Sequence, residues 1–413
     1  MITARKRLNQ RARFQRFRPL GWLALILLSQ VTTGCHRARW GSEGPFGREG
    51  IRAVWVTRWD FKSPSDIAKV MDNCKTAGFN TVLFQVRGAG TALYRSRIEP
   101  WADELGGRDP GFDPLSVACA EAHKRGMKLH AWVNVIPGWH GDKPPTNRQQ
   151  LYVSRPDWFW RDASGRRQPL GWYSSLNPCY PEVRKYLVGV MREIVSRYPV
   201  DGLHMDYIRF PNEWSKAYEG WSSVPDYPRD PRTLALFRKA TGKSPNDAPG
   251  LWSQWRTDQV TQLVRDIRAV TLSARPRAAL TAAVGPKPEE HKRTHFQDSP
   301  RWIAEGLVDG VFPMNYASDV GTFTQRLGAW SGARGEVPVV TGIMFDKRDP
   351  ALVSEQVGRA RQSTHHFCAF AYNSLFERLD RTGRPIMDEQ SSSRAALRQR
   401  VIPHIRHLAG MRS

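Results

Sequence analysis

The sequence predicts one large (β/α)8 barrel, which is an α/β fold. Eight short apolar runs alternate with helical patterns between residues 51 and 373. The number of runs and their total span of about 325 residues fit such a barrel. No glycine-rich dinucleotide fingerprint or P-loop follows any run, which argues against an open doubly wound sheet.

The elements follow one another in a regular order. Strands are predicted over residues 51–57, 81–87, 128–134, 202–208, 279–285, 310–316, 338–345 and 366–373. Helices are predicted over 63–78, 114–126, 181–198 and 250–274, and further helices begin near 298, 320 and 350. Long connections follow the second, third and fourth strands, on the barrel face where active sites are built. The barrel is assigned to 50–380, and 381–413 to a basic C-terminal helical extension.

The N-terminal region has the pattern of an export signal. Residues 1–19 carry seven Lys or Arg and no acid, and the apolar run "LGWLALILL" that follows is too short to span a bilayer. Small residues then precede Cys35 in "VTTGC", as in bacterial lipoproteins. We expect a lipoprotein-type signal peptide over 1–34, lipid attachment at Cys35, and a tether over 35–49. Ordinary cleavage and an uncleaved anchor are the alternatives.

Charge and cysteine content restrict the partners. The formal net charge is +23, and removing the seven positive charges of the signal leaves +16. Export argues against nucleic acid, so anionic envelope polymers or lipid head groups are the expected partners, unless the surface is simply arginine-rich. No cofactor is expected. No HExxH or similar pair indicates a catalytic metal, and structural zinc is not expected because the four cysteines of the mature chain form no CxxC pair: Cys74, Cys119, Cys179 and Cys368. Cys74 and Cys119 lie on the apolar sides of predicted helices, where we expect buried free thiols.

Polar and aromatic side chains stand at the ends of several predicted strands. Because side chains alternate along a strand, His204 and Asp206 share one face, which we expect to be the barrel interior. The alternative is that Asp206 only forms an ion pair with Arg209 or Arg87. The other strand-end residues are Gln85, Arg87, Trp132, Asn134, Asn315, Tyr316 and Tyr372. The loops add tryptophans on which a sugar could stack, and about half of them should be plain packing: Trp59, Trp101, Trp139, Trp158, Trp160 and Trp172.

Four motifs resemble one known family. "FQVRGAGTALYRSRIEPW", "HAWVN", "LNPCYPEVRKYLVGVMREIVSRYPVDGLHMDYIRFP" and "DGVFPMNYA" look like the glycosyl-hydrolase-like 10 domain of bacterial envelope proteins, over residues 48–377. The resemblance implies a (β/α)8 barrel, export, frequent lipid anchoring and, in some members, cleavage of peptidoglycan strands stripped of their peptides. Many members carry two adjacent acids where this chain has Asp206 and Tyr207.

A fainter resemblance is to chitinases of glycoside hydrolase family 18. Asp201, Gly202 and Asp206 match their D-G-x-D-x-D-x-E strand, whereas His204 replaces an acid and Ile208 stands at the acid/base position. A second motif, M-x-Y, matches Met314 and Tyr316. The chain therefore lacks the glutamate that this mechanism uses.

The chemistry predicted from these residues is glycoside hydrolysis, which ordinarily needs an acid and a second carboxylate. Asp206 is the first candidate, and Asp60 is slightly favoured as the second, ahead of Glu99, Asp103, Asp319 and Glu377. An N-acetyl group of the substrate could instead act as nucleophile, with Tyr316 as its hydrogen-bond partner.

Polar groups at the strand ends are assigned to substrate binding. Gln85, Asn134 and Asn315 suit hydroxyl or acetamido groups, and Arg87 and Arg209 suit a lactyl carboxylate. The remaining predicted contacts are Trp132, His204 and Tyr372. The sequence thus predicts an exported, lipid-anchored hydrolase of cell-wall glycan, with a non-catalytic glycan-binding barrel or an exopolysaccharide hydrolase as alternatives.

Overall fold

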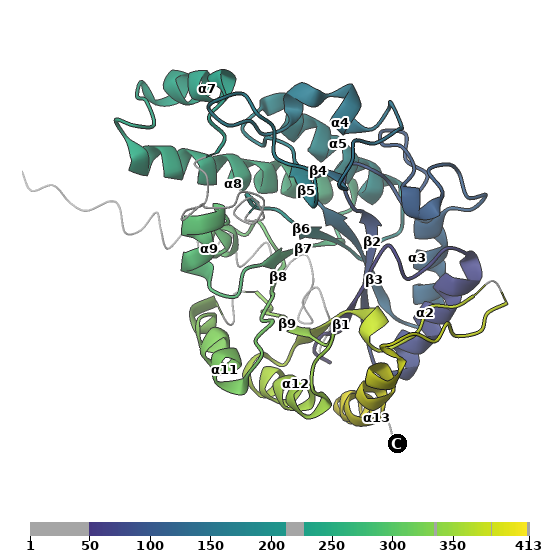
Figure 1. The fold of residues 1–413 in the computed structure, drawn as a ribbon. Helices are drawn as coiled ribbons and strands as arrows, with labels where there is room; N and C mark the ends of the chain where they lie inside the picture. Colours follow the sequence, from purple (N-terminus) through teal and green to yellow (C-terminus); the bar gives the residue numbers. More distant parts are fainter. Residues whose placement is uncertain (1–48, 212–226, 334–336, 381, 411–413) are drawn as a thin grey trace, which may run out of the picture. The chain divides into compact units, whose positions relative to one another are not determined.

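Eight parallel strands lie at the centre of the computed structural model, which describes residues 49–211, 227–333, 337–380 and 382–410. They form one sheet in the order β8-β7-β6-β3-β2-β1-β10-β9. Figure 1 shows these strands surrounded by helices. The strands are β1 (Arg52–Val56), β2 (Thr81–Arg87), β3 (Lys128–Asn134), β6 (Gly202–Asp206), β7 (Ala279–Val284), β8 (Gly310–Pro313), β9 (Thr341–Met344) and β10 (Phe367–Phe370).

The sheet closes on itself between its two ends. Parallel bridges join Val311 to Val339 and Met314 to Gly342, so that β8 meets the chain at β9. Closure removes both sheet edges, as in a TIM barrel. The predicted (β/α)8 fold class is confirmed, and each of the eight predicted strands contains one of the observed ones.

Proline sets the start of many of the helices. It occupies the first helical turn where its fixed φ and missing N–H cost nothing. The helices of the outer layer are α2 (Pro64–Thr76), α3 (Pro114–Lys124), α5 (Pro181–Arg197), α8 (Pro249–Ala274), α10 (Ser299–Ala304), α11 (Val320–Gly328), α12 (Pro350–Thr364) and α13 (Ser391–Leu408). At α2, Ser63 and Asp66 complete a reciprocal capping box. Each predicted helix start is within one residue of the observed start.

Strand alternation divides the apolar residues into two cores. Inward-facing side chains such as Trp55, Leu83 and Phe312 pack inside the barrel. Outward-facing ones such as Val54, Phe84 and Leu203 pack beneath the helices. The four described cysteines are buried free thiols, as expected for Cys74 and Cys119. His204 belongs to the inward face, so Asp206, two residues later on the same strand, faces the same way.

The C-terminal helix completes the barrel. Leu397, Val401 and Ile405 of α13 are buried in the outer core, and the helix packs on α12 and reaches the turn after α2 near Gly78. It therefore takes the eighth helix position, after β10, as Figure 1 shows beside α12 and α2. The boundary that we placed at residue 380 falls between the last strand and the last helix of one barrel.

The connections contain structure that the sequence pattern did not indicate. A hairpin of β4 (Pro137–His140) and β5 (Tyr173–Ser175) follows β3, together with α4 (Leu151–Ser154). Two additional helices, α7 (Pro231–Thr241) and α9 (Pro288–His295), precede α8 and α10. Short 3-10 turns lie at Asp103–Leu105, Pro156–Trp158, Ser331–Ala333 and Tyr372–Ser374. No helix among the described residues is long and apolar enough to cross a bilayer, and residues 1–48 with Cys35 lie outside them.

Candidate active site

Asp206 is the last residue of β6 and lies at the barrel mouth, the side on which the carboxyl ends of the strands meet. It is level with Asn134, the last residue of the neighbouring strand β3. Its Oδ1 accepts a hydrogen bond from the Tyr207 N–H (2.6 Å) and is 3.3 Å from Nη1 of Arg209. Both side chains of this pair are about one-tenth exposed. Asp206 is thus held by one oxygen at the surface of the barrel mouth.

The backbone turns sharply directly after Asp206. Tyr207 has a φ of +48°, a left-handed conformation that costs a residue with a side chain about 1–2 kcal/mol. This turn ends β6 two residues earlier than we predicted. Such strain persists where the surrounding structure fixes it, and it is common at active sites. Here it brings the Tyr207 N–H onto the Asp206 carboxylate.

Two tyrosines surround Asp206. Burial raises the pKa of Tyr316, which follows β8, well above its ordinary value, and the negative charge of Asp206 raises it further. Burial also raises the pKa of Tyr173, against the lowering effect of Arg58 and with a further contribution from Asp206. The rings of Tyr173 and Tyr207 are 4.8 Å apart, edge to face. Both hydroxyls therefore stay protonated near neutral pH and can donate hydrogen bonds beside the carboxylate.

Unpaired polar atoms lie just below this surface. Within the described part of the chain, Nε1 of Trp132 and the Oδ1 atoms of Asn134 and Asn315 are buried without a hydrogen-bond partner. The opposite ends of the two amides are used, because Asn134 donates to the Tyr173 hydroxyl (3.2 Å) and Asn315 to the Phe323 carbonyl (2.9 Å). Buried polar groups are rarely left unpaired. These atoms are available to a ligand or to water.

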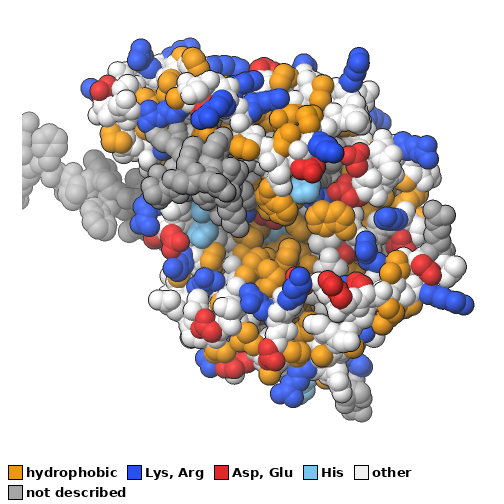
Figure 2. Space-filling model, viewed as in Figure 1, with side chains coloured by type: hydrophobic (Ala, Val, Ile, Leu, Met, Phe, Trp, Pro, Cys, Tyr) orange, Lys and Arg blue, Asp and Glu red, His pale blue; other side chains and the backbone are white. Residues whose placement is uncertain are grey.

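Figure 2 shows the molecule hollowed at the centre of this view, with hydrophobic side chains gathered around the hollow. Trp59 and Trp172 are among the exposed large apolar side chains, whereas Trp139 and Trp160 are buried in the outer core. Trp101 and Trp158 are half-buried. Two of the six loop tryptophans are thus buried, two are half-buried and two are exposed. Stacking of a sugar on the exposed rings stays a prediction.

Arg87 has a different role from the one predicted. It is fully buried, and it forms an ion pair with Glu99 in which Nη2 lies 2.8 Å from Oε1. Its Nη1 donates to the carbonyls of Val135 and Pro137, both at 3.1 Å, and Tyr186 donates to Glu99 (2.9 Å). Arg87 is therefore saturated inside the protein, and neither its side chain nor that of Glu99 is exposed to a substrate. Of the two alternative ion pairs of Asp206, the one with Arg209 is present and the one with Arg87 is not.

His204 and Tyr372 are also structural. The Trp55 indole donates to Nε2 of His204 (3.2 Å), and Nδ1 lies 2.9 Å from the Thr281 hydroxyl. Burial lowers the pKa of His204 well below its ordinary value, so the ring is a neutral bridge inside the barrel. Tyr372 accepts a hydrogen bond from Asn73 of α2 (2.8 Å) and packs in the outer core. Both side chains are therefore occupied by protein partners, His204 inside the barrel and Tyr372 in the outer core. Their predicted contacts with a substrate stay predictions.

The sequence did not single out Arg58 and Tyr173. Arg58 Nη1 donates to the Tyr173 hydroxyl (2.9 Å), and its Nε pairs with Glu104. The predicted binding residue Gln85 accepts the Arg58 N–H (3.0 Å), so it fixes the loop after β1 rather than a sugar. The alternating run "WYSSL" around Tyr173 could have indicated the strand that carries this residue. A three-residue strand is too short for its periodicity to be recognised.

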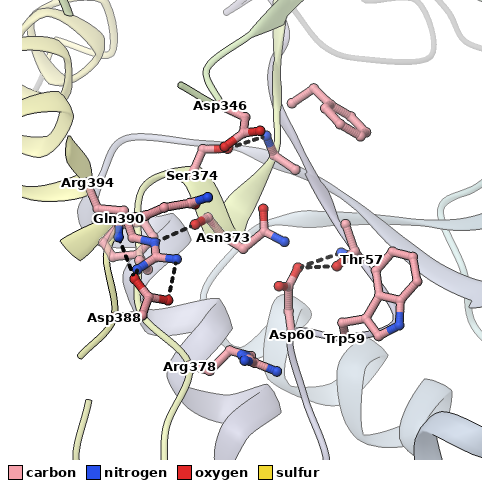
Figure 3. Close-up of a pocket in the computed structure, with 13 residues that line it drawn as sticks. Thr57, Trp59, Asp60, Asp346, Asn373, Ser374, Arg378, Asp388, Gln390 and Arg394 are labelled. Atoms are coloured by element: carbon pink, nitrogen blue, oxygen red, sulfur yellow. Dashed lines mark hydrogen bonds and ion pairs between the residues drawn. The ribbon is translucent and has the colours of Figure 1, made fainter. Parts of the chain in front are cut away.

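Asp60 lies in a pocket beside β1 and β10, shown in Figure 3. Its Oδ2 accepts the Thr57 N–H (2.6 Å) and hydroxyl (3.0 Å), whereas Oδ1 is buried and has no partner among the described residues. Burial raises the pKa of Asp60 to about 7, although the Thr57 bonds and Arg378 lower it. Neither Asp206 nor the two residues bonded to it, Tyr207 and Arg209, line this pocket.

This raised pKa predicts a pH-dependent effect on stability. Because the folded-state pKa of Asp60 exceeds the unfolded value of about 3.9, stability is lost as pH rises from about 4 through 7. Asp60→Asn keeps an acceptor for Thr57 and removes the charge. We expect it to raise the free energy of unfolding by about 1 kcal/mol or more at pH 8. Melting curves at pH 4 and pH 8 check this, and an equal change at both would contradict it.

Three other candidates for a second catalytic acid remain, and two of them have structural partners. Asp319 caps α11 by accepting the Thr322 N–H (2.7 Å), and Glu377 pairs with Arg398 (2.9 Å). Asp103 is exposed and lines a small cavity of about 140 Å³ with Glu104. No group of three or more His, Cys, Asp or Glu among the described residues could hold a metal ion.

A family model described as glycosyl hydrolase-like 10 matches residues 50–348, well over half of the chain. The chain belongs to the glycosyl hydrolase-like 10 family. It is 32% identical over 315 residues to "Glycosyl hydrolase DigH" of Escherichia coli K12, which is 64% of this chain and 65% of that protein. It is 27% identical over 300 residues to "Glycosyl hydrolase YngK" of Bacillus subtilis, and the match covers 65% of this chain and 54% of that protein. The match thus spans less than two thirds of each relative.

Solved structures share the barrel of this glycosyl hydrolase-like 10 chain. The PgaB (BpsB) glycoside hydrolase domain from Bordetella bronchiseptica has a TM-score of 0.53 and 15% identity, covering 78% of this chain and 94% of that one. Alpha-L-fucosidase isoenzyme 2 from Paenibacillus thiaminolyticus has a TM-score of 0.57 and 14% identity, and the match covers 86% of this chain and 48% of that one. At these identities the likeness is one of fold.

The family match ends at residue 348. It contains Asp206, Tyr173 and Tyr316, but β10 and α13 lie beyond it. The glycosyl hydrolase-like 10 segment therefore supplies the carboxylate and tyrosines at the barrel mouth, whereas one wall of the Asp60 pocket comes from the sequence that follows.

Proposed function

We propose that this protein is an exported glycoside hydrolase that cleaves the glycan strands of peptidoglycan after their peptides have been removed. The observation that carries the proposal is the position of Asp206, a carboxylate at the carboxyl end of β6 whose side chain is about one-tenth exposed and has protonated tyrosines beside it. Active sites of TIM-barrel enzymes lie at these strand ends. Family membership and two relatives named glycosyl hydrolases support the same reaction class.

A single carboxylate suits a mechanism in which the substrate assists. Asp206, in its protonated form, gives its proton to the glycosidic oxygen as the bond between that oxygen and C1 breaks. The carbonyl oxygen of the neighbouring N-acetyl group forms a bond to C1, and Tyr316 donates a hydrogen bond to that group. Water then attacks C1 and returns a proton to Asp206, which restores the acetamido group. Peptidoglycan sugars carry the N-acetyl group that this mechanism requires.

The rival proposal is a glycan-binding barrel without catalysis. Ile208, at the position of the chitinase acid, is completely buried and offers no proton. Incubation of the protein with denuded glycan strands, intact sacculi and chitin oligosaccharides, followed by mass spectrometry, separates the proposals. Fragments from denuded strands support hydrolysis of peptidoglycan. Sedimentation with sacculi without fragments would favour the binding barrel, and fragments only from chitin oligosaccharides would favour a different substrate.

Anchoring is the second part of the proposal. We propose that the N-terminal segment directs export and that Cys35 carries a lipid that holds the barrel at the cell envelope. The basic run, the short apolar run and the small residues before Cys35 support it. Cys35→Ala should move most of the protein from the membrane fraction to the soluble fraction, or block its processing. Unchanged fractionation and gel mobility of the variant would exclude lipid attachment.

A further inference from the structure

A pocket outside the surroundings of Asp206 has the size of a ligand site. The cavity beside β1 and β10 has a volume of about 420 Å³. A second cavity of about 410 Å³ adjoins it and shares Trp59, Asp60 and Arg378 as lining residues. Cavities of this volume commonly hold small molecules or sugar units. Figure 3 shows the first cavity with Asp60 between Thr57, Asn373 and Arg378.

The floor of the pocket contains an unsatisfied polar atom. Asp60 is 5% exposed, and its Oδ1 has no hydrogen-bond partner of normal geometry in the described chain, although the Asn373 side chain is near enough to lower the pKa of Asp60. Figure 3 shows both Thr57 bonds on one carboxyl oxygen, with the other oxygen turned away from Thr57. A buried polar atom left in this way costs about 1–3 kcal/mol. A ligand hydroxyl or amide would remove that cost.

The far wall is held rigidly. Arg394 of α13 pairs with Asp388 through two contacts (2.6 and 3.0 Å), and its Nε donates to the Asn373 carbonyl (2.7 Å). This guanidinium therefore fixes the segment before α13 against the turn after β10. All three residues lie beyond the part of the chain that the family model matches. These contacts fix the far wall of the pocket in place before any ligand binds.

The rim supplies an aromatic face and a cation. Trp59 is 42% exposed, and the Arg58 guanidinium lies 4.0 Å from its ring centroid, which fixes the ring orientation. Arg378 is exposed, and no ion pair or hydrogen bond of its side chain joins it to another described residue. Phe370 lines the same cavity, and its ring is 5.4 Å from that of Tyr316. The pocket thus adjoins the barrel mouth.

We propose that this pocket is a subsite for an N-acetylated pyranose unit of the glycan, next to the unit held at Asp206. Trp59 stacks on the apolar face of the ring, Asp60 bonds a hydroxyl or the acetamido N–H, and Arg378 donates to ring oxygens. The inference rests on the proposed function, because it assigns a second position on the same polysaccharide. It also accounts for an exposed tryptophan, an unsatisfied carboxyl oxygen and an unpaired arginine in one place.

Calorimetry with the tetrasaccharide of N-acetylglucosamine tests the proposal. The titrations use the full-length Asp206→Asn protein, so that the ligand is not cleaved. Trp59→Ala and Arg378→Gln, each added to that protein, should raise the dissociation constant for the tetrasaccharide about tenfold. The disaccharide, which can occupy the barrel mouth alone, should bind all variants within about twofold. Arg277→Gln is the matched control, because this exposed arginine precedes β7 at the opposite end of the barrel.

The outcomes distinguish failure of the subsite proposal from failure of the proposed hydrolase function. Weaker tetrasaccharide binding in both variants but not in Arg277→Gln supports the subsite, even if the parent cleaves no glycan. Equal affinity in all proteins overturns it, and so does the absence of tetrasaccharide binding to both the parent and the Asp206→Asn protein. Glycan turnover by the parent is measured separately and decides the proposed function. It does not depend on the tetrasaccharide affinities of the variants.

Discussion

Asp206→Asn is expected to reduce glycan turnover about 100-fold or more, because the amide cannot transfer the proton that a general acid or base must move. The fold should survive the change. The asparagine oxygen can still accept a hydrogen bond from the Tyr207 N–H. The change weakens only the ion pair with Arg209, in which the two atoms are 3.3 Å apart and both side chains are about one-tenth exposed. The Arg209 guanidinium also lies 4.4 Å from the Tyr207 ring centroid. The melting temperature should therefore stay close to that of the parent.

Asp201→Asn provides the matched control within the same motif. Asp201 precedes β6 at the other end of the barrel, where it accepts the Leu129 N–H (2.9 Å) and lies 2.8 Å from Nε2 of His123. Turnover by this variant should equal that of the parent. Initial rates on denuded glycan strands and thermal melts of the three proteins give the result. An Asp206→Asn protein that retains activity would remove Asp206 from the mechanism, whatever its stability.

Arg87→Met is expected to lower the free energy of unfolding by about 3–5 kcal/mol, because it leaves Glu99 as an unpaired charge in the interior. The side chains of both partners are completely buried. The loss should also loosen the chain after β3, where Arg87 holds the Val135 and Pro137 carbonyls. Chemical denaturation of the variant measures this change. A stable variant that binds acidic sugars less tightly would instead support the substrate contact predicted from the sequence.

Arg359→Met is the control for a lost ion pair. Arg359 pairs with Glu355 at 2.8 Å on the surface of α12, where both side chains are nearly half exposed. Exposed pairs of this kind contribute about 0.3–0.5 kcal/mol, so this variant should unfold almost like the parent. The double variant Arg87→Met with Glu99→Met should recover part of the loss, since it removes the stranded charge.

Local sequence signals were sufficient for the main elements. Short apolar runs and proline-initiated helices are local features, so the order of the barrel strands and most helix starts could be predicted. The hairpin at β4 and β5 could not, because its strands of four and three residues carry too little periodicity. The role of α13 was also missed, since its place between α12 and α2 depends on where the barrel closes.

The sequence by itself determined the family, the barrel and the inward direction of Asp206, because motif order and strand alternation are local properties of the sequence. Tertiary structure alone decided which polar residues reach the barrel mouth. His204 and Asp206 share the inward face of β6, and Arg87 ends β2, yet His204 and Arg87 are fully buried among partners from other strands and loops. Those partners lie 12 or more residues away, as Glu99 does from Arg87 and Trp55 from His204. Burial and pairing are properties of the packed barrel, so no local pattern could distinguish a core histidine from a catalytic carboxylate.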